Sequence, residues 1–143
     1  MRTLALLVIT IGLVGCGTPT ATTPAPVAAN SPQTQAHNIN KTLADSINTV
    51  EKTAIAMRNQ GKLAPTTTKQ IEDWAVSASL ISDKVEMEIT STDTWPVQKQ
   101  KILALLITVH IPNPGPIETT VQAALMAVGT VLNQLQSQVA QAQ

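Results

Sequence analysis

The chain has 143 residues, with nine Lys and Arg against nine Asp and Glu, so its formal net charge is zero. The cationic residues are scattered singly, which excludes the dense positive face that nucleic-acid binding requires. Phe and Tyr are absent, and Trp74 and Trp95 are the only aromatic residues. Because strands draw on aromatic as well as β-branched side chains, a core of Ala, Leu, Ile, Val and Met favours an all-α fold.

The start of the chain has the features of a secretory signal peptide. Arg2 supplies a positive charge, and the apolar run from Leu4 to Gly15 follows it. A transmembrane helix needs ~20 apolar residues to cross the hydrocarbon core, and this run stops earlier. We therefore expect residues 1–15 to be a cleaved signal and not a membrane span.

The only cysteine directly follows this run, in the sequence Leu13-Val14-Gly15-Cys16. This sequence resembles the lipobox of bacterial lipoproteins, in which signal peptidase recognises the three residues before the cysteine. The resemblance covers only the first part of the chain. It implies that the Cys16 thiol takes a diacylglyceryl group, that the chain is cut before Cys16, and that lipid holds the protein on a membrane. The alternative is a free cysteine that ends a signal peptide or an anchor helix.

The residue after the cysteine bears on the choice of membrane. In lipoproteins of bacteria with two membranes, retention at the inner membrane is associated with Asp at this place, and this chain has Gly17. The resemblance therefore implies attachment to the outer membrane if the source has two membranes, and otherwise to the outer face of the cell membrane. An exported domain with no second cysteine must fold on its core alone.

Residues 17–37 are rich in Thr, Pro, Ala, Ser and Gln and contain no Asp, Glu, Lys or Arg. Such a segment buries too little apolar surface to offset the entropy of ordering the chain. We expect residues 16–37, from the lipidated cysteine onward, to form a disordered tether. Residues 38–143 are then one folded domain.

Two helices are predicted in the first half of this domain. Apolar residues from Ile39 to Met57 recur at steps of three and four, and Gly61 supplies a stop signal. A second stripe runs from Ile71 to Ile89, and Thr67 and Gln70 have the spacing of a capping box at its start.

Two further helices are predicted in the second half. The segment Ile102–Ile111 is apolar nearly all round, which favours a buried central helix, and the prolines of residues 112–116 end it. The last apolar stripe runs from Ile117 to Val139. Four amphipathic segments with short turns indicate a small antiparallel bundle of about four helices. The tail of the last helix, 132–143, would pack within the chain, fray or mediate self-association.

No residue constellation identifies an activity, a cofactor or a metal site. His37 and His110 lack partners at metal-ligand spacing, and a helix-terminal role is favoured for His110. The densest acidic group favours a solvated helix face over a divalent cation site; its members are Asp83, Glu86, Glu88 and Asp93. Trp74 and Trp95, placed on either side of the turn between the second and third helices, either plug the end of the bundle or form a partner or ligand patch.

We therefore expect a non-enzymatic envelope lipoprotein, held on the membrane through the lipid on Cys16, whose helical domain has a structural or partner-binding role. One alternative is a module that binds an apolar ligand between its helices. Another is a prophage-encoded lipoprotein that blocks superinfection, which only the size and the anchor suggest.

Overall fold

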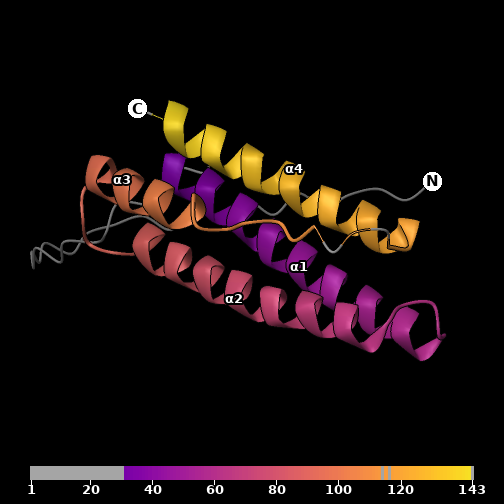
Figure 1. Ribbon diagram of the computed structural model, residues 1–143. Coiled ribbons are helices and arrows are strands. Elements are labelled where there is room, and N and C mark those ends of the chain that lie inside the picture. The colour runs from indigo at the N-terminus through magenta and orange to yellow at the C-terminus, as the bar shows by residue number, and fades with distance from the viewer. Residues whose placement is uncertain (1–30, 114, 116, 143) are drawn as a thin grey trace, which may run out of the picture.

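The computed structural model describes residues 31–113, 115 and 117–142. Within these residues the chain forms no strand and has four α-helices: α1 (Pro32–Asn59), α2 (Pro65–Ile89), α3 (Trp95–Leu106) and α4 (Thr119–Gln141) (Figure 1). The predicted all-α helical bundle is thereby confirmed. The signal, the Leu13–Cys16 motif and the tether as far as residue 30 lie outside the described residues.

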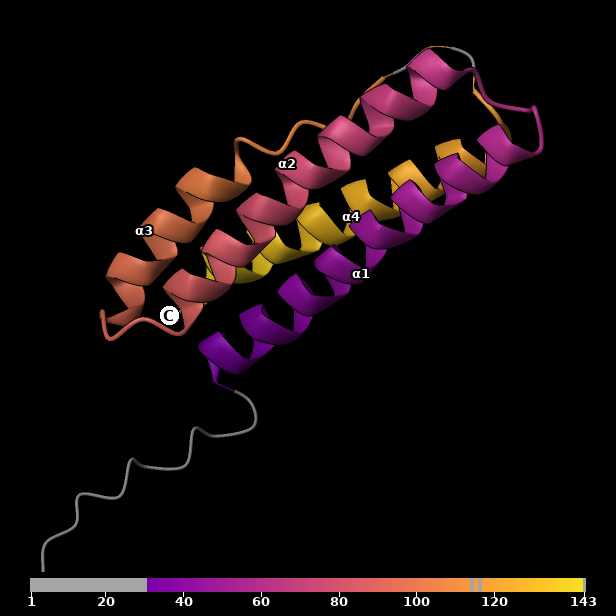
Figure 2. The same cartoon turned by 90° about the horizontal axis from the view of Figure 1, so that it is seen from below.

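The helices form an antiparallel bundle in which α1 packs against α2 and α4, and α3 packs against the same two helices (Figure 2). One end of the bundle holds Ser31, the α2–α3 turn and Ala142, and we refer to it as the Ser31 end. At this end, Gln138 Nε2 donates to Gln35 Oε1, and Lys99 Nζ donates to the carbonyl of Ala142. The α1–α2 turn and the start of α4 lie at the opposite end.

The core of the bundle has a heptad pattern. Buried residues in the three long helices alternate at steps of three and four, which is the a/d spacing of helices that interlock at a shallow angle. They are Ala36, Asn40, Leu43, Ile47, Val50 and Ala54 in α1, Thr68, Ile71, Ala75, Ala78, Ser82, Val85 and Ile89 in α2, and Val121, Leu125, Val128, Leu132, Leu135 and Val139 in α4. In α2 the small residues Ala75, Ala78 and Ser82 occupy the core, while Trp74 and Ile81 from the predicted stripe are only half-buried beside it. Small side chains at these positions leave little bulk between α2 and its neighbours.

The end of α1 follows the prediction made from Gly61. Gly61 has φ of 70°, a left-handed conformation that glycine adopts without strain. Its N–H donates to the carbonyl of Arg58 (2.9 Å), and the N–H of Lys62 donates to that of Met57 (2.9 Å). These two bonds form a Schellman motif, which satisfies the last carbonyls of the helix and turns the chain toward α2.

The start of α1 corrects the predicted domain boundary. The helix begins at Pro32, so residues 32–37 belong to the bundle and not to a tether. Ser31 is the N-cap: its Oγ accepts the N–H of Thr34 at 3.1 Å, and Pro32 occupies the first helical turn. Ala36, one turn further on, is fully buried. The boundary at residue 38 was wrong because this cap was read as part of the Pro-rich segment.

The start of α2 also differs from the prediction. The helix begins at Pro65, its N-cap is Ala64, and no side chain caps it. Thr67 and Gln70 therefore lie inside the helix and form no capping box at its start. Thr68 is buried, and its hydroxyl and N–H both bond to the carbonyl of Ala64 (3.1 and 2.9 Å). Because proline already has the φ of a first helical residue, the helix begins earlier than the threonines suggest.

The third helix is shorter and less buried than predicted. α3 ends at Leu106, and the residues after it leave the helix instead of forming its second half. Leu106 is fully buried, whereas Leu105 is half-buried and Ile107 is 72% exposed. α3 is one corner of the bundle and not a central helix.

The cause of the early end of α3 lies in the residues that follow it. Thr108 bonds the carbonyl of Leu105 through its hydroxyl (2.6 Å) and its N–H (3.0 Å), which forms a turn where the next helical residue would stand. Pro112 has no N–H and disfavours helical φ/ψ in the residue before it. The apolar residues Val109 and Ile111 still pack on the core, but from a non-helical connection.

The last helix packs within the chain over its whole length. Leu132, Leu135 and Val139 are buried, with exposures of 6%, 0% and 0%, and α4 lies along α1. Of the alternatives expected for this tail, the structure shows packing within the chain: its apolar residues lie in the core of the bundle.

Candidate functional site

The structure separates the two tryptophans. Trp95 is the first residue of α3, beside the α2–α3 turn. Trp74 lies 15 residues before the end of α2, which is about 22 Å along the helix axis. It lines a hollow of about 330 Å³ with Asp73 and His110. The prediction that both flank one turn was wrong, because 15 helical residues separate Trp74 from the end of α2 at Ile89, where the turn begins.

The two histidines also lie elsewhere than predicted. His37 is on α1, not in a tether, and its Nδ1 is 2.6 Å from Glu86 Oε1 of α2. His110 is in the connection after α3, four residues past the end of that helix, where it is exposed and its Nδ1 lies 2.9 Å from the carbonyl oxygen of Thr108. It therefore is not a helix-terminal residue.

The contact between His37 and Glu86 belongs to a polar layer that joins α1 and α2. Asn40 Nδ2 donates to the carbonyl of Ser82 (3.0 Å) and to Glu86 Oε2 (3.3 Å). Ser82 Oγ in turn donates to Asn40 Oδ1 (3.0 Å). Asn40 and Ser82 are each only 3% exposed. We call these four residues the polar layer.

The structure also shows the surroundings of Asp83, Glu88 and Asp93, the remaining members of the acidic group. Lys101 Nζ of α3 lies 2.7 Å from Asp93 Oδ2 and 3.2 Å from Glu88 Oε2, across the α2–α3 turn. Its bond to Asp93 and then its contact with Glu88 raise the pKa of the Lys101 ammonium above its ordinary value of 10.5. Asp83 is exposed. In the part of the chain that the structure describes, no three His, Cys, Asp or Glu residues lie together in a way that could hold a metal ion.

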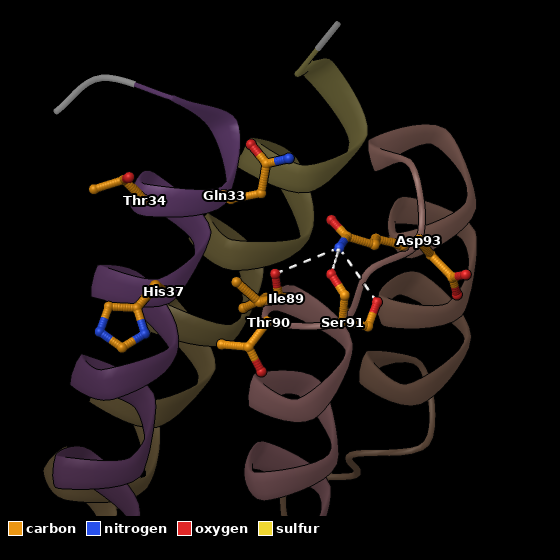
Figure 3. A pocket seen from close by; sticks show the side chains of 8 residues that line it. Gln33, Thr34, His37, Ile89, Thr90, Ser91 and Asp93 are labelled. Atoms are coloured by element: carbon orange, nitrogen blue, oxygen red, sulfur yellow. Dashed lines mark hydrogen bonds between the residues drawn. The ribbon is translucent and has the colours of Figure 1, made fainter. Parts of the chain in front are cut away.

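A hollow of about 570 Å³ opens at the Ser31 end of the bundle (Figure 3). Gln33, Thr34 and His37 of α1 line one side of it. The end of α2, the turn after it and the start of α3 line the other side, through Ile89, Thr90, Ser91, Asp93 and Gln98. Figure 3 shows Asp93 with its carboxylate turned away from the other labelled residues, and Lys101 accounts for that direction.

Gln98 is the buried polar side chain of this hollow, with 2% of its surface exposed. Its Nε2 donates to the carbonyl of Ser91 (2.9 Å), and further contacts reach Ser91 Oγ (3.3 Å) and the carbonyl of Ile89 (3.5 Å). Since carbonyls can only accept, these contacts fix which end of the amide faces them. The other end, Oε1, is buried and has no hydrogen-bond partner among the described residues.

Sequence reasoning missed both the polar layer and Gln98. Asn40 is three residues before Leu43, and Gln98 is four before Ile102, so both stand at core spacing. That spacing could have identified them, but the predicted stripes include apolar residues alone.

No protein-family model, curated protein or solved structure matches the chain. Among the helices of the described residues, none has the length and apolar character needed to cross a membrane.

Proposed function

We propose that the protein is a lipoprotein of the bacterial cell envelope, attached to a membrane by acyl chains on Cys16, and that its helical bundle is a non-enzymatic structural or partner-binding domain. The observation that carries the anchor is the sequence Leu13-Val14-Gly15-Cys16 at the end of an apolar run that starts after Arg2. Two acyl chains suffice for stable membrane binding, where one is marginal.

The position of Ser31 in the fold supports an orientation of the bundle relative to the membrane. Residues 17–30 separate Cys16 from the N-cap Ser31, and a flexible chain of this length would span about 20 Å. The bundle would therefore stand close to the membrane, with the Ser31 end toward the lipid. Its opposite end, with the α1–α2 turn, would point away from the membrane and be accessible to a partner.

The polar side chains support a structural role for the bundle. The polar layer joins α1 to α2, and Lys101 joins α3 to the end of α2 and the turn that follows it. These charged and polar groups are thus engaged in holding helices together.

Substitution of Cys16 by Ser tests the anchor, because a serine hydroxyl cannot form the thioether. Cys16→Ser is expected to abolish incorporation of labelled fatty acid and to leave an uncleaved precursor of lower mobility on a gel. Thr18→Ala, two residues away and outside the motif, is the matched control and should be labelled and cleaved normally. Cys16→Ser protein that stays in the membrane fraction with unchanged mobility would show that the lipobox interpretation is wrong.

A further inference from the structure

The hollow at the Ser31 end contains a hydrogen-bond acceptor that the described residues leave unused. Gln98 Oε1 is buried, and the amide cannot reverse because its Nε2 faces the carbonyl of Ser91 and the more distant carbonyl of Ile89. A buried acceptor without a partner destabilises the folded chain, so the site favours a molecule that supplies a donor.

The surroundings of Gln98 favour a positively charged donor. Ile89, Thr90 and Ser91 form the end of α2 and the residues after it, where the helix dipole is negative and attracts cations. The carbonyl of Ser91 retains a lone pair besides the one that Gln98 uses, and the Ser91 hydroxyl adds a further oxygen. No Lys or Arg lines the hollow, and the carboxylate of Asp93 is turned away and paired with Lys101, so the attraction for a cation comes from the helix end.

We propose that this hollow binds a primary ammonium group, which donates hydrogen bonds to Gln98 Oε1 and to the oxygens of Ser91. A primary ammonium has three donors and no acceptor, which matches a site whose free groups are acceptors. The group could belong to a free small amine or to the ethanolamine headgroup of a phospholipid. The lipid source rests on the proposed membrane anchor, whereas binding of a free amine does not.

Calorimetric titration of the protein as purified from its cells in a maltoside detergent tests the proposal with three small probes at neutral pH. Ethanolamine is expected to bind saturably. Choline keeps the charge but has no N–H donor, and ethanol lacks the charge, so both should bind about tenfold more weakly or worse. Equal binding of choline and ethanolamine would overturn the proposal, and so would the absence of saturable ethanolamine binding.

Two variants locate the site. Gln98→Leu removes the acceptor, and Thr90→Arg places a bulky cation at the exposed rim of the hollow. Both should weaken ethanolamine binding about tenfold or more. Gln136→Leu is the matched control, since Gln136 is a half-buried glutamine of α4 outside the hollow, and it should bind normally. If Gln98→Leu fails to fold, as circular dichroism would show, Thr90→Arg decides alone: unchanged binding in that folded variant refutes the site.

Competition identifies the source of the ammonium group. Vesicles of phosphatidylethanolamine that displace ethanolamine, when phosphatidylcholine vesicles do not, would assign the site to lipid headgroups. If neither displaces it, the ligand is a free amine. Fatty-acid labelling of Cys16 is measured separately, so a failed anchor and a failed ammonium site are told apart.

Discussion

At the scale of single residues, the polar layer places two polar side chains, Asn40 and Ser82, in a core that is otherwise mostly apolar. Asn40 and Ser82 occupy core positions of the heptad pattern in α1 and α2 and bond each other in both directions. A buried Asn at such a position can fix the register of two packed helices, because any shift leaves polar groups unpaired. We expect this layer to set the α1–α2 register at some cost in stability.

Substitution of one or both partners tests this role. Asn40→Ala leaves the Ser82 hydroxyl without a partner in the core, and it should lower the free energy of unfolding by about 1 to 3 kcal/mol. The double variant Asn40→Leu/Ser82→Ala removes both polar groups and should lose less, or gain stability. Denaturant unfolding gives both values. If Asn40→Ala is as stable as the natural chain, the layer has no such role.

The residues of the candidate site were less predictable than the core. Trp74, Trp95 and His37 were identified by their chemical type, but their partners depend on which helices are adjacent and on where each helix starts. Glu86 is 49 residues from His37 in the sequence, and no local pattern connects them. Only the packed bundle brings them within 2.6 Å.

At the scale of elements, α3 shows how far a hydrophobic pattern can mislead. The apolar residues from Ile102 to Ile111 are shared between a helix and a non-helical connection, and both cover the same core. Hydrophobicity predicts burial there but not backbone conformation, which Thr108 and Pro112 decide. The helices α1 and α4 were predicted better because apolar residues at steps of three and four indicate a helix directly. Gly61 also marks the end of α1.

The losses of stability on substituting Leu106 and Leu105 test this placement of α3. Leu106→Ala should cost about 2 to 5 kcal/mol because the side chain is fully buried. Leu105 is half-buried, so Leu105→Ala should cost clearly less. Gln134→Ala, on the exposed side of α4, should stay within about half a kcal/mol and serves as the control. Denaturant unfolding of the three variants checks this order; equal losses for Leu105 and Leu106 would contradict the placement of α3.

At the scale of the whole molecule, the N-terminal limit of the bundle is set by Ser31 and not by the end of the Pro-rich composition. The start of α1 has a capping residue, a buried Ala36 and a hydrogen bond that Gln35 accepts from Gln138 of α4. The domain that folds cooperatively should therefore include residues 31–37, which the composition alone would assign to the tether.

Two deletions of equal length test this boundary. Removal of residues 20–29 should leave the melting temperature unchanged, because the segment is proposed to be a tether without packing. Removal of residues 26–35 takes away the Ser31 cap and the Gln35–Gln138 bond, and it should lower the melting temperature by several degrees. Calorimetry of both proteins measures the difference. A shorter tether that also lowers the melting temperature would mean that residues before Ser31 contribute to packing.

The shared position of Ser31 and Ala142 at one end of the bundle has a mechanical consequence. A force applied between the proposed membrane anchor and the end of α4 would pull apart the neighbouring ends of α1 and α4, where Gln35 meets Gln138. The two helices would then separate turn by turn, like a zipper opened from its end, instead of sliding past each other under load. Load transmitted to a partner at the opposite end would instead run along the helix axes, so the direction of pulling, and not contact strength alone, would determine how much force the domain withstands.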